Sequence, residues 1–140
     1  MAGTHHTDKT FRFELVSPER VLASEEASMV VVPGEAGDFG VLAGHSPLLS
    51  SVRPGVVRIT LPDGAMRKVF VSGGFADVGA EICAVLAEEA VNVDDLDRAE
   101  LADTLKTLED SLAAAANDAM KTAQVPRDID ITRAKIAALQ

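Results

Sequence analysis

Hydrophobic and polar residues form short runs over the first two thirds of the chain. Residues 11–16 alternate with the period of a half-buried strand, and residues 29–32 are continuously apolar, which indicates a strand covered on both faces. Further strand-like runs occupy residues 20–23, 56–61, 66–72, 75–78 and 82–86. Glycine and proline separate these runs, and Asp63-Gly64 between two of them is typical of a hairpin turn. The pattern predicts a β-sandwich or barrel that ends near residue 91.

The stretch from Pro33 to Leu49 has the densest glycine spacing in this part of the chain. Its glycines are Gly34, Gly37, Gly40 and Gly44. Glycine reaches backbone angles closed to other residues, so this spacing predicts tight turns that close short strands. We expect these loops to gather at one end of the β domain, with Glu35, Asp38 and His45 on the turns.

The pattern changes after Gly79, beyond which the chain has no glycine. Apolar residues then recur at steps of four and three, which predicts a helix with a narrow apolar seam. The seam comprises Leu101, Leu105, Leu108, Leu112, Ala115 and Ala119. Asp94 or Asp95 is expected to cap the start of this helix. Because a residue before proline is disfavoured in the α conformation, the helix is predicted to stop around Val125-Pro126.

A second, shorter helix is predicted after this break. Asp128 or Asp130 is expected to cap it, and it should end at Leu139, with Ile129 and Ile136 available to face the first helix. The tail is therefore predicted to be an antiparallel two-helix hairpin. The expected organisation is a polar lead-in over residues 1–10, a β-sandwich over 11–91 and a helical hairpin over 92–140.

Composition narrows the classes of function. The chain has 140 residues, 47% of them hydrophobic, with five Phe but no Trp or Tyr, so the core must be largely aliphatic. A net charge of −9 argues against nucleic acid or an anionic membrane as the partner. The single cysteine, Cys83, excludes an internal disulfide and lies in an apolar run, so we expect it to be buried. No run approaches the ~20 apolar residues of a membrane helix.

The search for catalytic residues yields little. His45, Ser46 and Asp38 are the elements of a nucleophilic triad, but neighbouring residues rarely converge at hydrogen-bonding distance. The glycine spacing is not that of a dinucleotide-binding loop. The His5-His6 pair has no third ligand nearby, and no cluster has metal-ligand spacing. We expect no metal, no cofactor and no catalysis, which leaves an interaction or structural role.

Several of these segments, in this order, carry a family resemblance. They are Val16-Ser17-Pro18-Glu19, residues 33–42, Gly44-His45-Ser46-Pro47-Leu48-Leu49, Arg53-Pro54-Gly55, residues 70–75 and Val85-Leu86-Ala87-Glu88. Over Phe13 to Ala90 the chain resembles the N-terminal domain of the epsilon subunit of bacterial F-type ATP synthases, equivalent to the mitochondrial delta subunit. The resemblance implies an all-β sandwich of about ten strands followed by two helices.

The resemblance also implies partners and a place in the cell. It implies a non-catalytic rotor subunit at the cytoplasmic face of the bacterial inner membrane, docked on the gamma subunit and on the polar loops of the c-ring. The positions that match the ring-facing loops are Glu35, Asp38, Phe39 and His45. Ring loops in the family carry an arginine, which acidic residues complement. For Asp38 a turn residue bonded to its own backbone is the alternative, and for His45 a satisfied structural histidine.

The helical tail carries a partial match to a regulatory motif. Some family members bind ATP there through an Ile/Leu-Asp-x-x-Arg-Ala sequence, and others reach the alpha/beta catalytic head with these helices. Here Asp95, Arg98 and Ala99 supply Asp-x-x-Arg-Ala, but Asp94 stands where Ile or Leu is expected. A regulatory ATP-binding module is therefore the alternative to a purely mechanical subunit. The 13 residues from Asp128 to Gln140 have balanced charge, which predicts weak inhibition of ATP hydrolysis.

Overall fold

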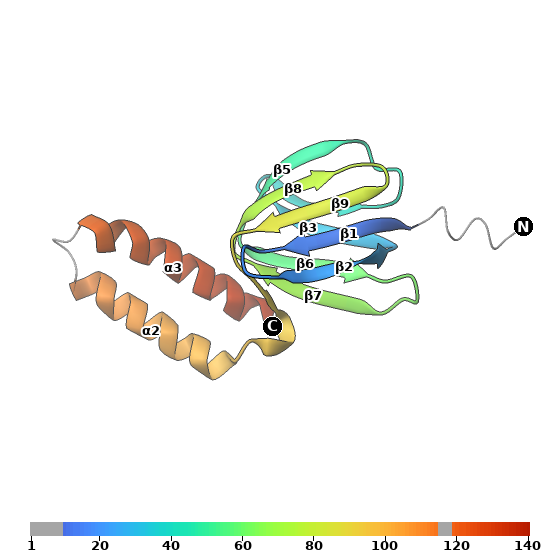
Figure 1. The fold of residues 1–140 in the computed structure, drawn as a ribbon. Coiled ribbons are helices and arrows are strands. Elements are labelled where there is room, and N and C mark those ends of the chain that lie inside the picture. Colours follow the sequence, from blue (N-terminus) through green and yellow to red (C-terminus); the bar gives the residue numbers. More distant parts are fainter. Residues whose placement is uncertain (1–9, 115–118) are drawn as a thin grey trace, which may run out of the picture. The chain divides into compact units, whose positions relative to one another are not determined.

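A computed structural model describes residues 10–114 and 119–140, with side chains described except over residues 119–122. The chain divides into two compact units, Met1–Asn92 and Val93–Gln140. Within the described residues the first unit is all β and the second is helical (Figure 1). The elements are β1 (Phe11–Val16), β2 (Val21–Ala27), β3 (Met29–Gly34), β4 (Gly37–Val41), β5 (Leu48–Val52), β6 (Gly55–Thr60), β7 (Met66–Val71), β8 (Gly74–Val78), β9 (Ile82–Ala87), β10 (Ala90–Asn92), the 3₁₀ turn η1 (Val93–Asp95), α2 (Arg98–Ala114) and α3 (Ala119–Ala138).

The strands form one continuous path that folds into a sandwich, as the sequence predicted. Their order is β10-β7-β6-β3-β5-β8-β9-β1-β2, with β4 paired to β3 off this path. Pairs along the path are antiparallel apart from β1 and β9, which run parallel. This parallel pair places the first strand of the unit beside one of its last strands.

The core is aliphatic with a few phenylalanines. The alternation predicted over β1 is confirmed, because Phe11, Phe13 and Leu15 are buried while the residues between them are not. The prediction that β3 is covered on both faces is wrong. Val30 and Val32 are fully buried but Met29 is 38% exposed, since β3 has one face on the core and the other facing outward.

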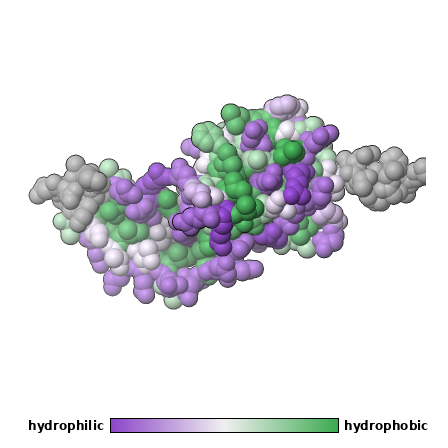
Figure 2. All heavy atoms as spheres, in the orientation of Figure 1, coloured by the Kyte–Doolittle hydropathy of each residue, from purple (hydrophilic) through white to green (hydrophobic). Residues whose placement is uncertain are grey.

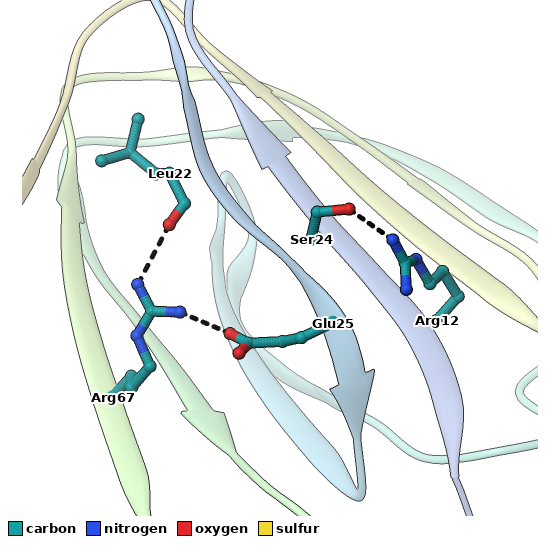
Figure 3. A network of polar contacts seen from close by, with 5 residues as sticks. All are labelled: Arg12, Leu22, Ser24, Glu25 and Arg67. Carbon is teal, nitrogen blue, oxygen red and sulfur yellow. Dashed lines mark hydrogen bonds and ion pairs between the residues drawn. The ribbon is translucent and has the colours of Figure 1, made fainter.

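Arg67 joins β7, the second strand from one end of the sheet path, to β2 at the other end (Figure 3). From β7 its guanidinium binds the carboxylate of Glu25 at 2.5 Å and the carbonyl oxygen of Leu22 at 3.0 Å, both on the edge strand β2. No backbone ladder joins β2 to β7 among the described strands. On the other side of β2, Arg12 donates to the hydroxyl of Ser24. Side chains therefore close the sandwich where main-chain pairing stops.

The second unit is an antiparallel hairpin of α2 and α3 (Figure 1). The predicted seam is confirmed over Leu101, Leu105, Leu108 and Leu112, which are half-buried while most of the residues between them are exposed. The predicted positions Ala115 and Ala119 lie outside the described side chains. The expected cap at Asp94 or Asp95 is wrong, because these residues belong to η1.

The residue that caps α2 is Asp97. Its carboxylate accepts hydrogen bonds from the backbone N–H groups of Ala99 at 2.9 Å and Glu100 at 3.2 Å. These are two of the donors that have no partner inside the first turn of a helix. Asp94 and Asp95 belong to the 3₁₀ turn, so α2 begins later than the sequence pattern predicted.

The predicted break at Pro126 is also wrong, because this proline lies inside α3. A proline in a helix interior removes one hydrogen bond and costs about 3 kcal/mol. Val125, Ile129 and Thr132 lie on one face and are buried. Burying each of the two aliphatic side chains contributes about 1.5–3 kcal/mol, enough to offset the proline. The second helix thus has 20 residues, with four basic and two acidic side chains, in place of the 13 neutral residues expected.

Candidate functional site

The hairpin turn between β3 and β4 is the most tightly built loop in the Pro33–Leu49 stretch. Gly34 pairs with Gly37 across it, which leaves Glu35 and Ala36 at its tip. Gly37 has a φ of +136°, a conformation that favours glycine. A Cβ on Gly34 would lie 2.8 Å from the carbonyl oxygen of Gly37. Both glycines are therefore required by the geometry of the turn.

Arg53, from the turn between β5 and β6, holds this hairpin through three bonds. Its backbone N–H donates to the carbonyl oxygen of Pro33 at 2.9 Å. Its guanidinium donates to the carbonyl oxygen of Gly34 and to the carboxylate of Asp38, each at 2.5 Å. The sequence showed Arg53 only as part of a turn motif, since nothing in its spacing from Asp38 indicates a contact.

The predicted ring-facing residues of this hairpin differ in their surroundings. Glu35 is exposed at the tip, and its backbone N–H donates to the carbonyl oxygen of Ser51 at 2.9 Å. Among the described residues, the Glu35 carboxylate has no hydrogen-bond or ion-pair partner. Asp38 is paired with Arg53, so it is not a turn residue bonded only to its own backbone. Phe39 is half-buried against the core.

His45 does not join these residues. It follows the far end of β4, and the three residues from Asp38 to Val41 alone span about 10 Å of extended strand. Its imidazole N–H donates to the carbonyl oxygen of Ser46 at 2.6 Å, and the neighbouring Gly44 binds the carbonyl oxygen of Ala80. The expectation that the whole stretch gathers at one end of the domain is therefore wrong. A triad of Asp38, His45 and Ser46 is excluded by the same separation.

An exposed row of apolar side chains crosses the outer face of β5, β8, β9, β1 and β2. Phe75 lies directly opposite Leu86, Leu86 opposite Val16, and Val16 opposite Val21. On β5 the residue opposite Phe75 is Ser51, and Leu49 lies diagonally across from Phe75 on the same face. Phe75 is 54%, Leu86 55% and Leu49 71% exposed. A band of hydrophobic surface crosses this part of the molecule in Figure 2. We call Leu49, Phe75, Leu86, Val16 and Val21 the apolar row.

The three residues of the partial ATP motif, Asp95, Arg98 and Ala99, do not form one site: Ala99 and Arg98 make hydrogen bonds within the hairpin, and Asp95 lies in the preceding turn. Asp95 belongs to η1, and the backbone N–H of Ala99 is bound by the Asp97 cap. The guanidinium of Arg98 donates to the carbonyl oxygen of Leu139 at 2.9 Å, near the end of α3. A cation there complements the negative end of a helix. Farther along the hairpin, Arg133 pairs with Glu109 at 3.1 Å.

Cys83 and the possible metal ligands were the remaining candidates among the described residues. Burial, with a smaller contribution from the Asp77 carboxylate, raises the pKa of the Cys83 thiol to about 12, so the reactive thiolate is disfavoured. Within the described residues, no group of three or more histidine, cysteine or carboxylate side chains is placed to hold a metal ion. In the same part of the chain no helix is long and apolar enough to span a bilayer.

Comparison with known proteins gives consistent matches over both units. A sequence model described as ATP synthase, Delta/Epsilon chain, beta-sandwich domain matches residues 10–93. The epsilon chain of ATP synthase from Rhodospirillum rubrum is 45% identical over 130 residues, 93% of this chain and 96% of the relative. The epsilon chains of Mesorhizobium japonicum and Brucella canis are 44% and 48% identical, over 79% and 74% of this chain and 82% and 79% of theirs.

Solved structures share the fold at lower sequence identity. A chain in the mitochondrial ATP synthase of Euglena gracilis, a structure of OSCP, F1 and the c-ring, has a TM-score of 0.82 at 23% identity. The match covers 94% of this chain and 82% of that one. A chain from the central stalk and c-ring of the Tetrahymena thermophila enzyme has a TM-score of 0.53 at 15% identity, over 61% and 68% of the two chains.

Proposed function

Because this chain belongs to the delta/epsilon family of ATP synthase subunits, we propose that it is a non-catalytic subunit of the central stalk of a proton-translocating ATP synthase. It links the gamma subunit to the c-ring and so couples rotation to ATP synthesis. The observation that carries this proposal is the 45% identity over 93% of the chain, because it spans the sandwich and the helical hairpin together. The enzyme's chemistry then belongs to other subunits.

The apolar row supports a protein partner on the face of the sheet. Contiguous exposed apolar side chains are typical of interaction sites, and those of Phe75, Leu86 and Leu49 are each more than half exposed. A flat sheet face suits the side of a helix or coiled coil in the partner. We assign this row to the gamma subunit, which is the long partner against which the family's sandwich docks.

The β3–β4 turn supports a second contact, with the polar loops of the c-ring. Ring loops in the family carry an arginine, and this turn presents carboxylates on a hairpin that Arg53 holds in place. His45 lies at the far end of β4 and is therefore assigned to a different surface. Phe39 is half-buried and supports the turn from the core side.

The closed hairpin supports a limited role in regulating ATP hydrolysis. The contacts of Arg98 with Leu139 and of Arg133 with Glu109 join its two helices. An extended tail that reaches the alpha/beta head would have to break both contacts and expose the leucine seam. We propose that the hairpin stays mostly closed, and that ATP is not a ligand of Asp95, Arg98 and Ala99, since Arg98 is already engaged.

This assignment places the protein peripherally at the cytoplasmic face of the bacterial inner membrane. The test is to express a tagged copy in its own host and to purify it in mild detergent. Gamma and c subunits should copurify in fixed proportion, and membranes lacking the chain should lose ATP-driven proton pumping that the purified chain restores. Purification without gamma would refute the proposal.

A further inference from the structure

Arg58 on β6 and Lys68 on β7 lie directly opposite each other on an exposed face of the sheet. Arg58 stands between Val57 and Ile59, which are fully buried, so its side chain points to the outer face. Lys68 shares this face, because residues directly opposite each other lie on the same side of a sheet. Neither side chain has a hydrogen-bond or ion-pair partner among the described residues. We call Arg58 and Lys68 the basic pair.

The basic pair is unfavourable in the free chain. Like charges directly opposite each other destabilise a sheet, because their Cβ atoms are only about 4.5–5.5 Å apart. The surrounding strands β3, β6, β7 and β10 carry three basic residues and no acidic one. The third base, Arg67, is already paired with Glu25. This local surplus of positive charge is opposite in sign to the chain as a whole, whose net charge is −9.

Two exposed methionines lie beside the basic pair on the same face. Met29 is paired with Thr60 and Thr60 with Met66, in a row two residues along the strands from the basic pair, which is about 7 Å. Met29 is 38% and Met66 55% exposed. The methyl end of Met29 lies over Gly40, where a Cβ would come within 3.1 Å of it. Methionine side chains adapt their shape to a partner, so this face offers an adaptable apolar strip beside two cations.

From these positions and charges we infer that the basic pair and the two methionines form a docking surface for an acidic amphipathic helix of another protein. Carboxylates at positions i and i+4 of a helix lie about 5–6 Å apart, which matches the separation of two cross-strand side chains. A helix with its side chains is about 10 Å wide, so it also covers the methionine row. Its carboxylates would offset the repulsion within the basic pair by two attractions.

This docking surface is separate from both contacts of the proposed function. The apolar row lies on the outer face of β5, β8, β9, β1 and β2, and the sheet path passes from that layer to β3 at the pair Gly34 and Val52. A partner lying across one layer does not reach the outer face of the other, so we assign the docking surface to a different protein. Two cations on an acidic chain are too few for nucleic acid or an anionic membrane, whose binding relies on many such contacts.

The test is carbodiimide cross-linking, which joins a lysine amine to a carboxylate without a spacer and therefore only where the two are in contact. Cells of its own host carry the full-length variants in place of the wild type, and the linked residues are identified by mass spectrometry. The variants are Arg58→Gln and Lys68→Arg, of which the second keeps the charge but removes the reactive amine. Lys106, which is exposed on α2, is the internal control for unspecific linking.

We expect Lys68 to be linked to an acid of another protein, in a helix with a second acid three or four residues away. Arg58→Gln should lower the yield of this link about two- to fivefold, as expected for the loss of one exposed ion pair, and leave links at Lys106 unchanged. Lys68→Arg should lose the link. Lys68→Glu, combined with a lysine in place of the linked acid of the partner, should restore it. The free Arg58→Gln chain should melt at or above the wild-type temperature, because a like-charge contact is removed.

Four results would overturn the inference. Lys68 could form no link, or be linked only to carboxylates of this chain. The yield from Arg58→Gln could equal that of the wild type. The exchange of charges could fail to restore the link. Finally, an Arg58→Gln chain that melts below the wild type would show that the basic pair serves the stability of the sheet.

Discussion

Replacing Phe75 by threonine should weaken binding to the gamma subunit without unfolding the sandwich. Phe75 lies in the apolar row directly opposite Leu86, and its side chain is 54% exposed and points away from the core. In the free chain the substitution removes surface that water already reaches, and threonine keeps the preference for a strand. The change should therefore appear in binding and not in the stability of the free chain.

The size of the effect follows from the exposed area. A phenylalanine side chain offers about 200 Å², of which the 54% left exposed is about 100 Å². At about 25 cal/mol per Å², covering this area contributes about 2.5 kcal/mol to association, which is about 70-fold in affinity. Threonine retains part of that contact, so a loss of about 10- to 70-fold is expected.

The assay is titration of the purified chain with gamma, followed by calorimetry. Met66→Thr is the matched control, because Met66 is 55% exposed but lies on β7, away from the apolar row. Thermal unfolding of each free variant shows whether the fold is intact. The assignment of the apolar row to gamma is refuted if Phe75→Thr binds as tightly as the wild type, or if Met66→Thr is equally impaired.

Four further predictions concern the core, the hairpin and the unit boundary. Gly74→Ala should destabilise the sandwich by more than 3 kcal/mol in urea unfolding, because the new Cβ would lie 2.0 Å from a backbone oxygen of β9. Gly64→Ala is the control: its Cβ would meet open space, and only the φ of +92° should cost about 1–2 kcal/mol. Cys83 should resist thiol reagents at pH 9 until the protein unfolds. Because folding raises the pKa of this thiol from 9.0 to about 12, its contribution to the free energy of unfolding should be complete below pH 9 and should be lost as the pH rises towards about 12. Arg98→Gln should speed amide exchange in the last turn of α3 about two- to tenfold, because it removes the hydrogen bond to Leu139. ATP should not raise the melting temperature of the wild type. A rise in melting temperature that Arg98→Gln abolishes would instead show that ATP binds at Arg98. A chain ending at Asn92 should melt cooperatively and still bind gamma, and a broad, non-cooperative transition would show that the helices complete the core.

Local features of the chain were predictable from the sequence. Alternation fixes the buried face of β1, because successive side chains of a strand point to opposite sides. Spacing of four and three fixes the leucine seam of α2 for the analogous reason in a helix. Gly37 was predicted to lie in a turn, and its φ of +136° is a backbone conformation that other residues rarely adopt. The family also follows from the sequence, because its segments are local and occur in order.

The tertiary structure decided what each functional residue touches. Asp38 and Arg53 are 15 residues apart, and Arg98 and Leu139 are 41 apart, so no local periodicity relates either pair. Their contacts exist only because β3 and β5 meet in one sheet and α2 and α3 run antiparallel.

Two further points depended on the fold as a whole. His45 is close to Asp38 in sequence but far from it in space, because an extended strand separates them. Pro126 stays inside a helix because the buried face of α3 offsets its cost, a balance that depends on the packed hairpin and not on the proline alone.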